Sequence, residues 1–436
     1  MDDIKKEYMN HNSNVLLKKV RDILLFLSSL YPEILFSLFL IPTRFNALTE
    51  KFNIPSFLNP VYLLFAVIVC IIFIKVTLNN SCFIIPRLLL LSFIGFIIFM
   101  AIGLSYSVAF QYGLSKTLEF ITLSSLACFA PFFLLNNLNV FERFLKTYIV
   151  LGFFLSIFIF VSSPYAFQFY SSKDYPKFHT TLGNNYLGLQ YILGISILTM
   201  IYYFMFSRRM NKIQVTLAVL LTLLLGAALL YSPGKGPIIS LFLTVIIMSL
   251  VSLKIDRQKI VFNRKTLLYT LSVLAGGILL LSTVGWMFTL RLQKMFEPGY
   301  YGMTERVVNS KIAFQVFLNH PFFGAGIGSF SEYAAKIEGI ERMKYPHNLP
   351  LEIISEMGLT GFILFAFMIG YAFKQLFFLA NKYRETPYHN LSNVVISFLI
   401  FTFLSSLTGG NINNPLLFAW IGIAFVLEPM INGIEV

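Results

Sequence analysis

The stretch Leu88–Leu104 reads LLLLSFIGFIIFMAIGL and carries no charged side chain. A helix needs about 20 mostly apolar residues to cross a bilayer, and Leu217–Tyr231 is a second run of this kind. The 436 residues are 57% apolar and 12% charged, whereas soluble domains are about a quarter charged. The composition therefore predicts an all-α, polytopic membrane protein. It excludes a soluble enzyme, a secreted disulfide scaffold and a disordered chain.

Similar apolar runs along the chain predict about twelve transmembrane helices. They cover residues 22–41, 59–75, 88–105, 114–135, 143–162, 184–206, 213–231, 236–253, 266–288, 350–373, 390–408 and 414–432. The strands of an outer-membrane barrel would instead alternate apolar and polar residues. We expect helices 1–9 within residues 1–289, one long loop domain at 290–349, and helices 10–12 within 350–436.

The basic residues set the predicted orientation. The net charge is +13, but the Lys and Arg side chains lie between the apolar runs and not on one soluble region, so nucleic-acid binding is rejected. Cytoplasmic loops of membrane proteins are enriched in Lys and Arg, and this bias places both termini in the cytoplasm. The long loop at 290–349 then lies on the outer side.

Within that loop, Thr304–Asn319 is predicted to be a helix. Val308, Ile312 and Val316 form an apolar stripe at helical spacing, and the sequence His320-Pro321 ends the helix. The Gly-rich run at 324–328 is interpreted as a flexible turn with candidate hinges, because no strand precedes it as a dinucleotide site requires. Three nearby phenylalanines are expected to lie against the membrane surface: Phe322, Phe323 and Phe330.

A small set of polar residues is predicted near the outer boundary of the membrane. The set comprises Lys235, Arg291, Arg306, Lys311 and His347. His347 comes just before a predicted helix in which Pro350 suits the first turn. The positive end of that helix disfavours the imidazolium form, so His347 is a candidate general base. The fixed cations form a candidate anion site.

Each of these residues also has a structural interpretation. His347 could cap the helix or bind a lipid headgroup, Lys235 could reach toward the membrane surface, and Arg306 could form an exposed ion pair with an acidic neighbour. Lys116 and Glu119 lie one turn apart within a span, which suggests either a functional intramembrane pair or a self-neutralising one. Asp174 is the only aspartate on the predicted outer face, so no metal site is expected there.

Residues 306–361 resemble the C-terminal signature of the O-antigen ligase and polymerase superfamily. The resemblance comprises Arg306, the run HPFFGAGIGSF at 320–330, Pro346-His347-Asn348, and then Glu352, Glu356, Gly358 and Gly361. The turn SPGKGP at 232–237 resembles a Ser-Arg-Gly-type element of the family. Lys235 takes the place of an arginine in many relatives, which keeps the charge but loses the planar fork.

The resemblance implies a bacterial inner-membrane glycosyltransferase, inverting and metal-independent, with its active site on the periplasmic side and no cofactor. It implies a donor glycan linked to undecaprenyl diphosphate and an acceptor that is another lipid-linked repeat or lipid A–core. His347 would be the base and Arg306 would contact the diphosphate. Four further residues are expected to contact the substrate: Lys235, Arg291, Asn348 and Lys116. A chain-length regulator is a possible partner, and membrane lipids surround the protein.

The residues leave three activities open. The SPGKGP variant and the outer turn at Gly409-Gly410-Asn411 resemble polymerases more than ligases, and we therefore expect an O-antigen polymerase. An O-antigen ligase is the alternative, and an O-linked protein glycosyltransferase ranks below it. The competitor from another class is a transporter or flippase for lipid-linked sugars. The long loop with its His and Arg, the few ionisable residues in mid-span and the lack of an internal repeat argue against it.

Overall fold

The computed structural model describes residues 31–41, 59–78, 84–166, 186–206, 211–232, 234–251, 254–256, 259–261, 277, 282, 301–338 and 345–433. The helices are α2 (Pro32–Phe39), α4 (Pro60–Leu78), α5 (Arg87–Leu104), α6 (Phe110–Glu119), η2 (Phe120–Ser124), α7 (Ser125–Phe129), α8 (Pro131–Leu134), α9 (Leu138–Ala166), α10 (Tyr186–Phe206), α11 (Lys212–Tyr231), α12 (Gly236–Val251), α15 (Tyr301–Asn319), α16 (Phe330–Glu338), α17 (Leu349–Lys382), α18 (Tyr388–Gly409) and α19 (Pro415–Asn432). The strands β1 (Lys254–Asp256) and β2 (Lys259–Val261) form an antiparallel pair.

The protein is an all-α polytopic membrane protein, as the composition predicted. In the described part of the chain, 9 helical segments are long and apolar enough to cross a membrane, and α12 is a shorter apolar helix. These ten correspond to ten of the predicted spans. Of the other two predicted spans, 22–41 is described only from residue 31 on, where it holds α2. The span 266–288 is described only at residues 277 and 282, so the total of twelve stays a prediction.

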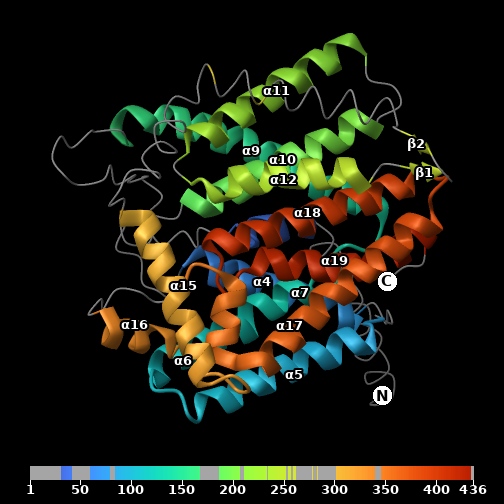
Figure 1. Ribbon diagram of the computed structural model, residues 1–436. Coiled ribbons are helices and arrows are strands. Elements are labelled where there is room, and N and C mark those ends of the chain that lie inside the picture. Colours follow the sequence, from blue (N-terminus) through green and yellow to red (C-terminus); the bar gives the residue numbers. More distant parts are fainter. Residues whose placement is uncertain are drawn as a thin grey trace, which may run out of the picture.

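The two ends of the helix bundle differ. Helices α15 and α16 gather at one end, on the left in Figure 1, whereas β1 and β2 lie at the opposite end. The sequence predicts that the segment at 254–265 and the long loop face opposite sides of the membrane. The arrangement of these elements is compatible with that prediction. The short β-ribbon itself was not predicted from the sequence.

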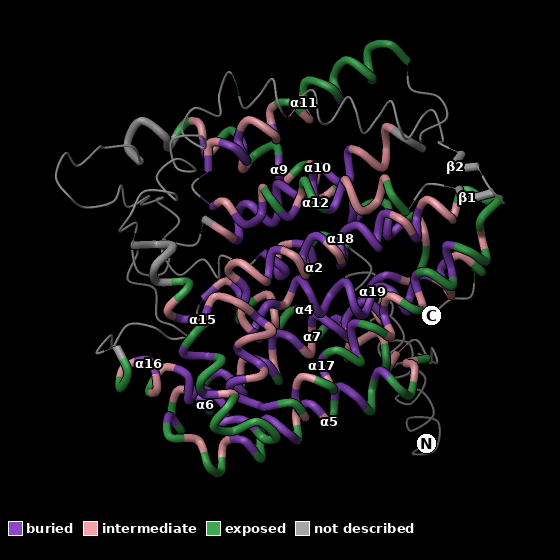
Figure 2. Tube along the Cα trace, viewed as in Figure 1, coloured by how far each residue is buried: buried purple, intermediate pink, exposed green. Residues whose placement is uncertain are grey.

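Helix α19 lies at the centre of the bundle. All residues from Leu416 to Leu427 are buried, which is the pattern of a helix surrounded by protein on every side. By contrast, only 17% of the apolar window of α4 is buried, so α4 faces outward. Figure 2 shows the same contrast between the buried α19 and the exposed outer part of α11. The turn before α19 is therefore fixed at one end by a helix that packs against protein on every side.

Helix α17 is broken at Gly358. This residue has φ 62° and ψ −163°, so the backbone leaves the helical path and resumes it at Leu359. Helix α17 packs against α15, α5 and α18, and Leu351 of its first part, residues 349–357, packs against the core that α15 forms with α16. The break sets the direction of the short first part, which carries the residues that follow His347.

Candidate functional site

The loop at residues 345–348 leads into α17 and carries His347. Asn348 is the N-cap of the helix: its Oδ1 accepts a hydrogen bond from Leu351 N at 3.0 Å. Its Nδ2 donates to Leu407 O of α18 at 3.0 Å. Both ends of the Asn348 amide are therefore engaged in structure, and His347 is not the capping residue. Asn348 thus positions the start of α17, and its contact with the substrate stays a prediction.

His347 adopts a left-handed backbone conformation, with φ 57°. Side chains other than glycine seldom occupy this region, and when they do the strain often marks a functional position. The ring of Tyr345 packs against it at 4.4 Å between centroids. His347 is half-buried, so its imidazole is held by neighbours while one side stays accessible.

The surroundings of His347 favour the neutral imidazole. Burial lowers its pKa from 6.5 to about 4, and the positive charge of Arg306 acts in the same direction. The sequence predicted a neutral ring from the helix dipole alone. The structure adds two causes, partial desolvation and a nearby guanidinium. A ring that is unprotonated at neutral pH can accept a proton from a hydroxyl group.

Arg306 lies on α15, which packs against the first part of α17. Ile312, Val316 and Phe330 join one small core between α15, α16 and the Gly-rich run, so the predicted stripe is confirmed. Phe330 is fully buried, and its prediction as a membrane-facing residue is wrong. Phe322 and Phe323 are exposed. Arg306 itself is exposed, which leaves its guanidinium open to an anion.

The loop after α15 forms hydrogen bonds with the backbone groups that the break leaves without helical partners in α17. Ser355 O and Glu356 O accept from Ala325 N and Gly326 N, each at 3.0 Å. On the other side of the break, Leu359 N and Thr360 N donate to Pro321 O and Phe322 O at 2.8 and 3.2 Å. The groups that an unbroken helix would pair with each other are thus paired with the loop. A break inside a membrane needs such partners.

Glycine is required where the loop and the broken helix meet. Gly324 has φ 74° and Gly358 has φ 62°, a region that glycine enters without steric cost. A Cβ on Gly324 would overlap the backbone of Glu356 and Met357, and one on Gly358 would overlap Phe322. The Gly-rich run at 324–328 was expected to be a flexible turn. Residues 324–330 are buried, so this run is a packed segment in the structure.

The turn between α5 and α6 closes over the other side of the loop. Ser107 Oγ donates to Ile327 O at 2.7 Å, and Tyr106 OH donates to Phe323 O at 2.8 Å. Burial raises the pKa of Tyr106 above its ordinary value, so its hydroxyl stays protonated as the bond requires. The loop is therefore clamped between the α5–α6 turn and the break in α17.

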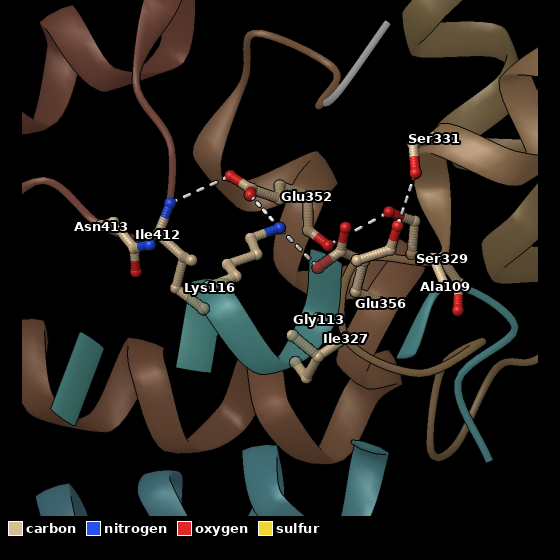
Figure 3. A network of polar contacts seen from close by, with 12 residues as sticks. Ala109, Gly113, Lys116, Ile327, Ser329, Ser331, Glu352, Glu356, Ile412 and Asn413 are labelled. Atoms are coloured by element: carbon tan, nitrogen blue, oxygen red, sulfur yellow. Dashed lines mark hydrogen bonds and ion pairs between the residues drawn. The ribbon is translucent and has the colours of Figure 1, made fainter. Parts of the chain in front are cut away.

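Lys116 lies in a buried ion-pair network beneath this loop. Its Nζ contacts Glu352 Oε1 and lies 2.6 Å from Glu356 Oε2, and all three side chains are at most 3% exposed. Figure 3 shows Lys116 reaching from α6 between the two carboxylates of α17. Glu352 Oε2 also accepts from Ile412 N at 3.0 Å. The network joins α6, α17 and the turn before α19.

The partners of Lys116 differ from both interpretations of its sequence. Its carboxylate partners are Glu352 and Glu356, and Glu119 accepts from Asn413 Nδ2 at 2.8 Å. The ammonium is enclosed by two carboxylates, so it has no exposed face for a substrate diphosphate. The contacts of Lys116 in this structure are therefore with protein carboxylates, and its contact with the substrate stays a prediction. Glu352 and Glu356 lie one turn apart on one helix face, and this spacing could have indicated a shared cation.

Lys235 lies in the turn between α11 and α12, away from this network in the sequence. Gln190 Nε2 of α10 donates to Gly234 O at 2.8 Å and holds the turn. Gly236 packs against Thr408 of α18 so closely that a Cβ would overlap it. Lys235 is half-buried. Arg291, also expected at the site, lies outside the described residues.

Comparison with known proteins adds one finding. Residues 186–366 match a family model described as O-Antigen ligase. The matched region includes Lys235, Arg306, His347 and both carboxylates of the network, and excludes Lys116 and the turn before α19. No curated protein matches the chain.

Proposed function

We propose that the chain, of which residues 186–366 match a family model described as O-Antigen ligase, belongs to the O-antigen polymerase and ligase superfamily and is an O-antigen polymerase. It transfers an undecaprenyl-diphosphate-linked glycan onto a hydroxyl of another lipid-linked repeat. The reaction inverts the anomeric centre and uses no metal. The protein acts in the bacterial inner membrane, with both termini in the cytoplasm. The loop domain at 290–349, which follows helices 1–9 and precedes helices 10–12 in the sequence, forms the active site on the periplasmic side.

One observation carries the proposal: a half-buried histidine held neutral beside an exposed guanidinium. Burial and the charge of Arg306 lower the pKa of His347 to about 4, so the ring is unprotonated at neutral pH. Arg306 can bind a diphosphate through two parallel N–H donors. A base and an anion-binding group near enough to interact electrostatically suit glycosyl transfer from a diphosphate.

The proposed chemistry is a single displacement. His347 accepts the proton of the acceptor hydroxyl as its oxygen attacks the anomeric carbon of the donor. The new C–O bond forms while the bond from the anomeric carbon to the diphosphate oxygen breaks, and the electron pair leaves with undecaprenyl diphosphate. Arg306, aided by Lys235, stabilises the charge that develops on the leaving group. A positioned base contributes about 10²–10⁴-fold to such a step.

Arg306 links donor binding to the strength of the base. In the free enzyme its charge disfavours the imidazolium form of His347. A bound diphosphate neutralises that charge, so proton uptake by His347 becomes easier once the donor is in place. His347 thus stays unprotonated before the donor arrives and becomes a better proton acceptor afterwards.

The ligase is a second candidate because the matched family model carries that description. A ligase would use the same donor class and the same base, and it would differ in its acceptor, lipid A–core. The turn motifs that resemble polymerases favour the first candidate.

A lipopolysaccharide gel from a deletion strain of the native host separates these functions. For a polymerase, deletion removes the ladder and leaves core with one repeat. For a ligase, deletion leaves bare core while polymer accumulates on the carrier lipid. Wild-type chain restores the ladder and His347→Ala does not. An unchanged pattern in the deletion strain would contradict both functions and favour a transporter, whose activity would instead depend on polar residues in mid-span.

A further inference from the structure

A cavity of about 250 Å³ lies next to the loop that carries His347. Phe39 and Val61 contribute to its apolar wall, and Tyr345 and the turn at residues 409–415 contribute to its polar wall. Because the Tyr345 ring also packs against His347, the cavity and the proposed base share one wall. Leu123 lines the cavity from η2, which is a π-helical segment. Such segments are rare in proteins, and many of those known lie at functional sites.

Three buried side chains of the cavity wall have polar atoms without a partner in the described part of the chain. These atoms are Tyr191 OH, Asn413 Oδ1 and Asn414 Nδ2. The three residues are only 5%, 6% and 6% exposed, and buried polar groups are nearly always hydrogen-bonded.

The other amide atoms of the two asparagines are already used. Asn413 Nδ2 donates to Glu119, and Asn414 Oδ1 accepts from Leu416 N at the start of α19. These bonds fix the orientation of both amides. What remains is one acceptor, one donor and one hydroxyl group, on three residues that line a single cavity.

The chemistry of the wall favours a neutral polar ligand. None of the described residues that line the cavity is charged, so they offer a phosphate no counter-ion, and an acyl chain would leave the three polar atoms unpaired. A sugar ring matches both features, because its hydroxyls donate and accept while its faces pack on aromatic rings. Pockets for drug-sized ligands measure roughly 300–1,000 Å³, so this one suits a single ring.

We propose that this cavity binds one neutral sugar ring of the acceptor glycan. The inference rests on the proposed function and adds where the acceptor lies: Tyr191, Asn413 and Asn414 hold the ring, and Tyr345 separates it from His347. The hydroxyl that attacks the donor projects past Tyr345 toward the imidazole. The diphosphate of the donor is held separately, at Arg306.

The test measures binding of the acceptor sugar without turnover. The probe is the lipid-free repeat-unit oligosaccharide released from the host polysaccharide, titrated by ligand-observed NMR into the purified full chain. Tyr191→Phe removes only the free hydroxyl, and Asn414→Asp keeps the α19 cap while replacing the free donor. Each is expected to weaken binding about three- to tenfold, the effect of one neutral hydrogen bond.

Tyr148→Phe is the matched control. Its hydroxyl is also buried without a partner in the described region, but its ring packs on Phe144 and Trp420 in the core. This variant is expected to bind the oligosaccharide like the wild type, and inorganic pyrophosphate is expected not to compete.

The proposal is overturned if the wild type shows no saturable binding, or if Tyr191→Phe and Asn414→Asp bind as tightly as Tyr148→Phe. His347→Ala separates this inference from the proposed function, since it is expected to bind the oligosaccharide normally. Normal turnover in His347→Ala with the expected binding pattern would contradict the assigned base and leave the sugar site standing. An inactive His347→Ala with an unchanged Tyr191→Phe would remove the sugar site alone.

Discussion

The rings of Tyr345 and His347 are in contact, with their centroids 4.4 Å apart. Tyr345 also lines the cavity at the turn before α19, and the charge of Arg306 acts on the imidazole from α15. The contact thus joins the proposed acceptor site to the proposed base.

The pH dependence of activity reports the state of His347. A base must be unprotonated, and the pKa of about 4 means that kcat/KM should fall only as the pH drops toward 4. An ordinary histidine would give an acid limb near 6.5. The acid limb of the kcat profile should lie at a higher pH than that of kcat/KM, because a bound diphosphate offsets the charge of Arg306 and so raises the pKa of His347. An acid limb of kcat/KM at 6.5 or above would contradict the assignment.

The same shift predicts a contribution to stability with a definite sign. The folded state holds His347 with a pKa below its unfolded value of 6.5, so the unfolded state binds the proton more readily. The contribution is fully present above pH 6.5 and is lost as the pH falls from 6.5 toward 4. When the pH falls from 6.5 to 4, the unfolding temperature of His347→Gln should drop less than that of the wild type.

Replacing Arg306 separates its charge from its shape. Arg306→Ala removes the repulsion, so the acid limb of kcat/KM should move upward while staying below 6.5, since burial is the larger cause of the shift. Arg306→Lys keeps the charge and should leave the limb in place, yet weaken donor binding because the planar fork is lost. Identical pH profiles for Arg306→Ala and the wild type would show that the two residues do not interact.

Removing the ammonium from the buried network should destabilise the fold. Lys116→Met leaves Glu352 and Glu356 buried without their cation, which is expected to lower the free energy of unfolding by about 3–5 kcal/mol. Adding Glu352→Gln and Glu356→Gln should recover part of this loss. Lys146→Met is the control, since Lys146 pairs with Glu142 on an exposed helix face, where a pair contributes about 0–1 kcal/mol. Denaturation in detergent measures all variants, and equal losses for Lys116→Met and Lys146→Met would contradict the network.

A methyl group at the helix break should disturb the loop that pairs with it. Gly358→Ala places a Cβ against Phe322 at a positive φ, so the loop must shift and the Arg306 helix that precedes it shifts as well. We expect lower stability and lower activity together. Gly370→Ala lies in the same α17 with no atom within 4 Å of the new Cβ, and it should be neutral. Similar effects for both variants would contradict the pairing of loop and break.

Much of the fold was predictable because apolar runs report directly on membrane spans. Ten predicted spans correspond to apolar helices in the described region, and the stripe on α15 packs as its spacing predicted. Phe330 could not be placed from its sequence, since an aromatic side chain suits both a membrane surface and a protein core. The break at Gly358 was also not predicted, because a glycine inside an apolar run leaves the period unchanged.

The site was predicted less completely because its contacts are long-range. A neutral His347 was inferred from its helix, whereas Arg306 and burial, the causes seen in the structure, come from another segment. Lys116 was paired with Glu119 on local spacing, but its partners lie more than two hundred positions away. The unpaired atoms of Tyr191, Asn413 and Asn414 become visible only when three segments meet at one cavity.

The most direct measurement is the rate of glycan transfer by purified His347→Ala, with His347→Gln as a second variant that keeps a polar side chain. The purified lipid-linked donor is used as substrate, and donor binding and thermal unfolding are measured on the same preparations. We expect transfer to fall by about 10²–10⁴-fold in both variants while donor binding and folding stay close to wild type. Normal turnover by a well-folded His347→Ala would contradict the account, since no base would then be needed at this position.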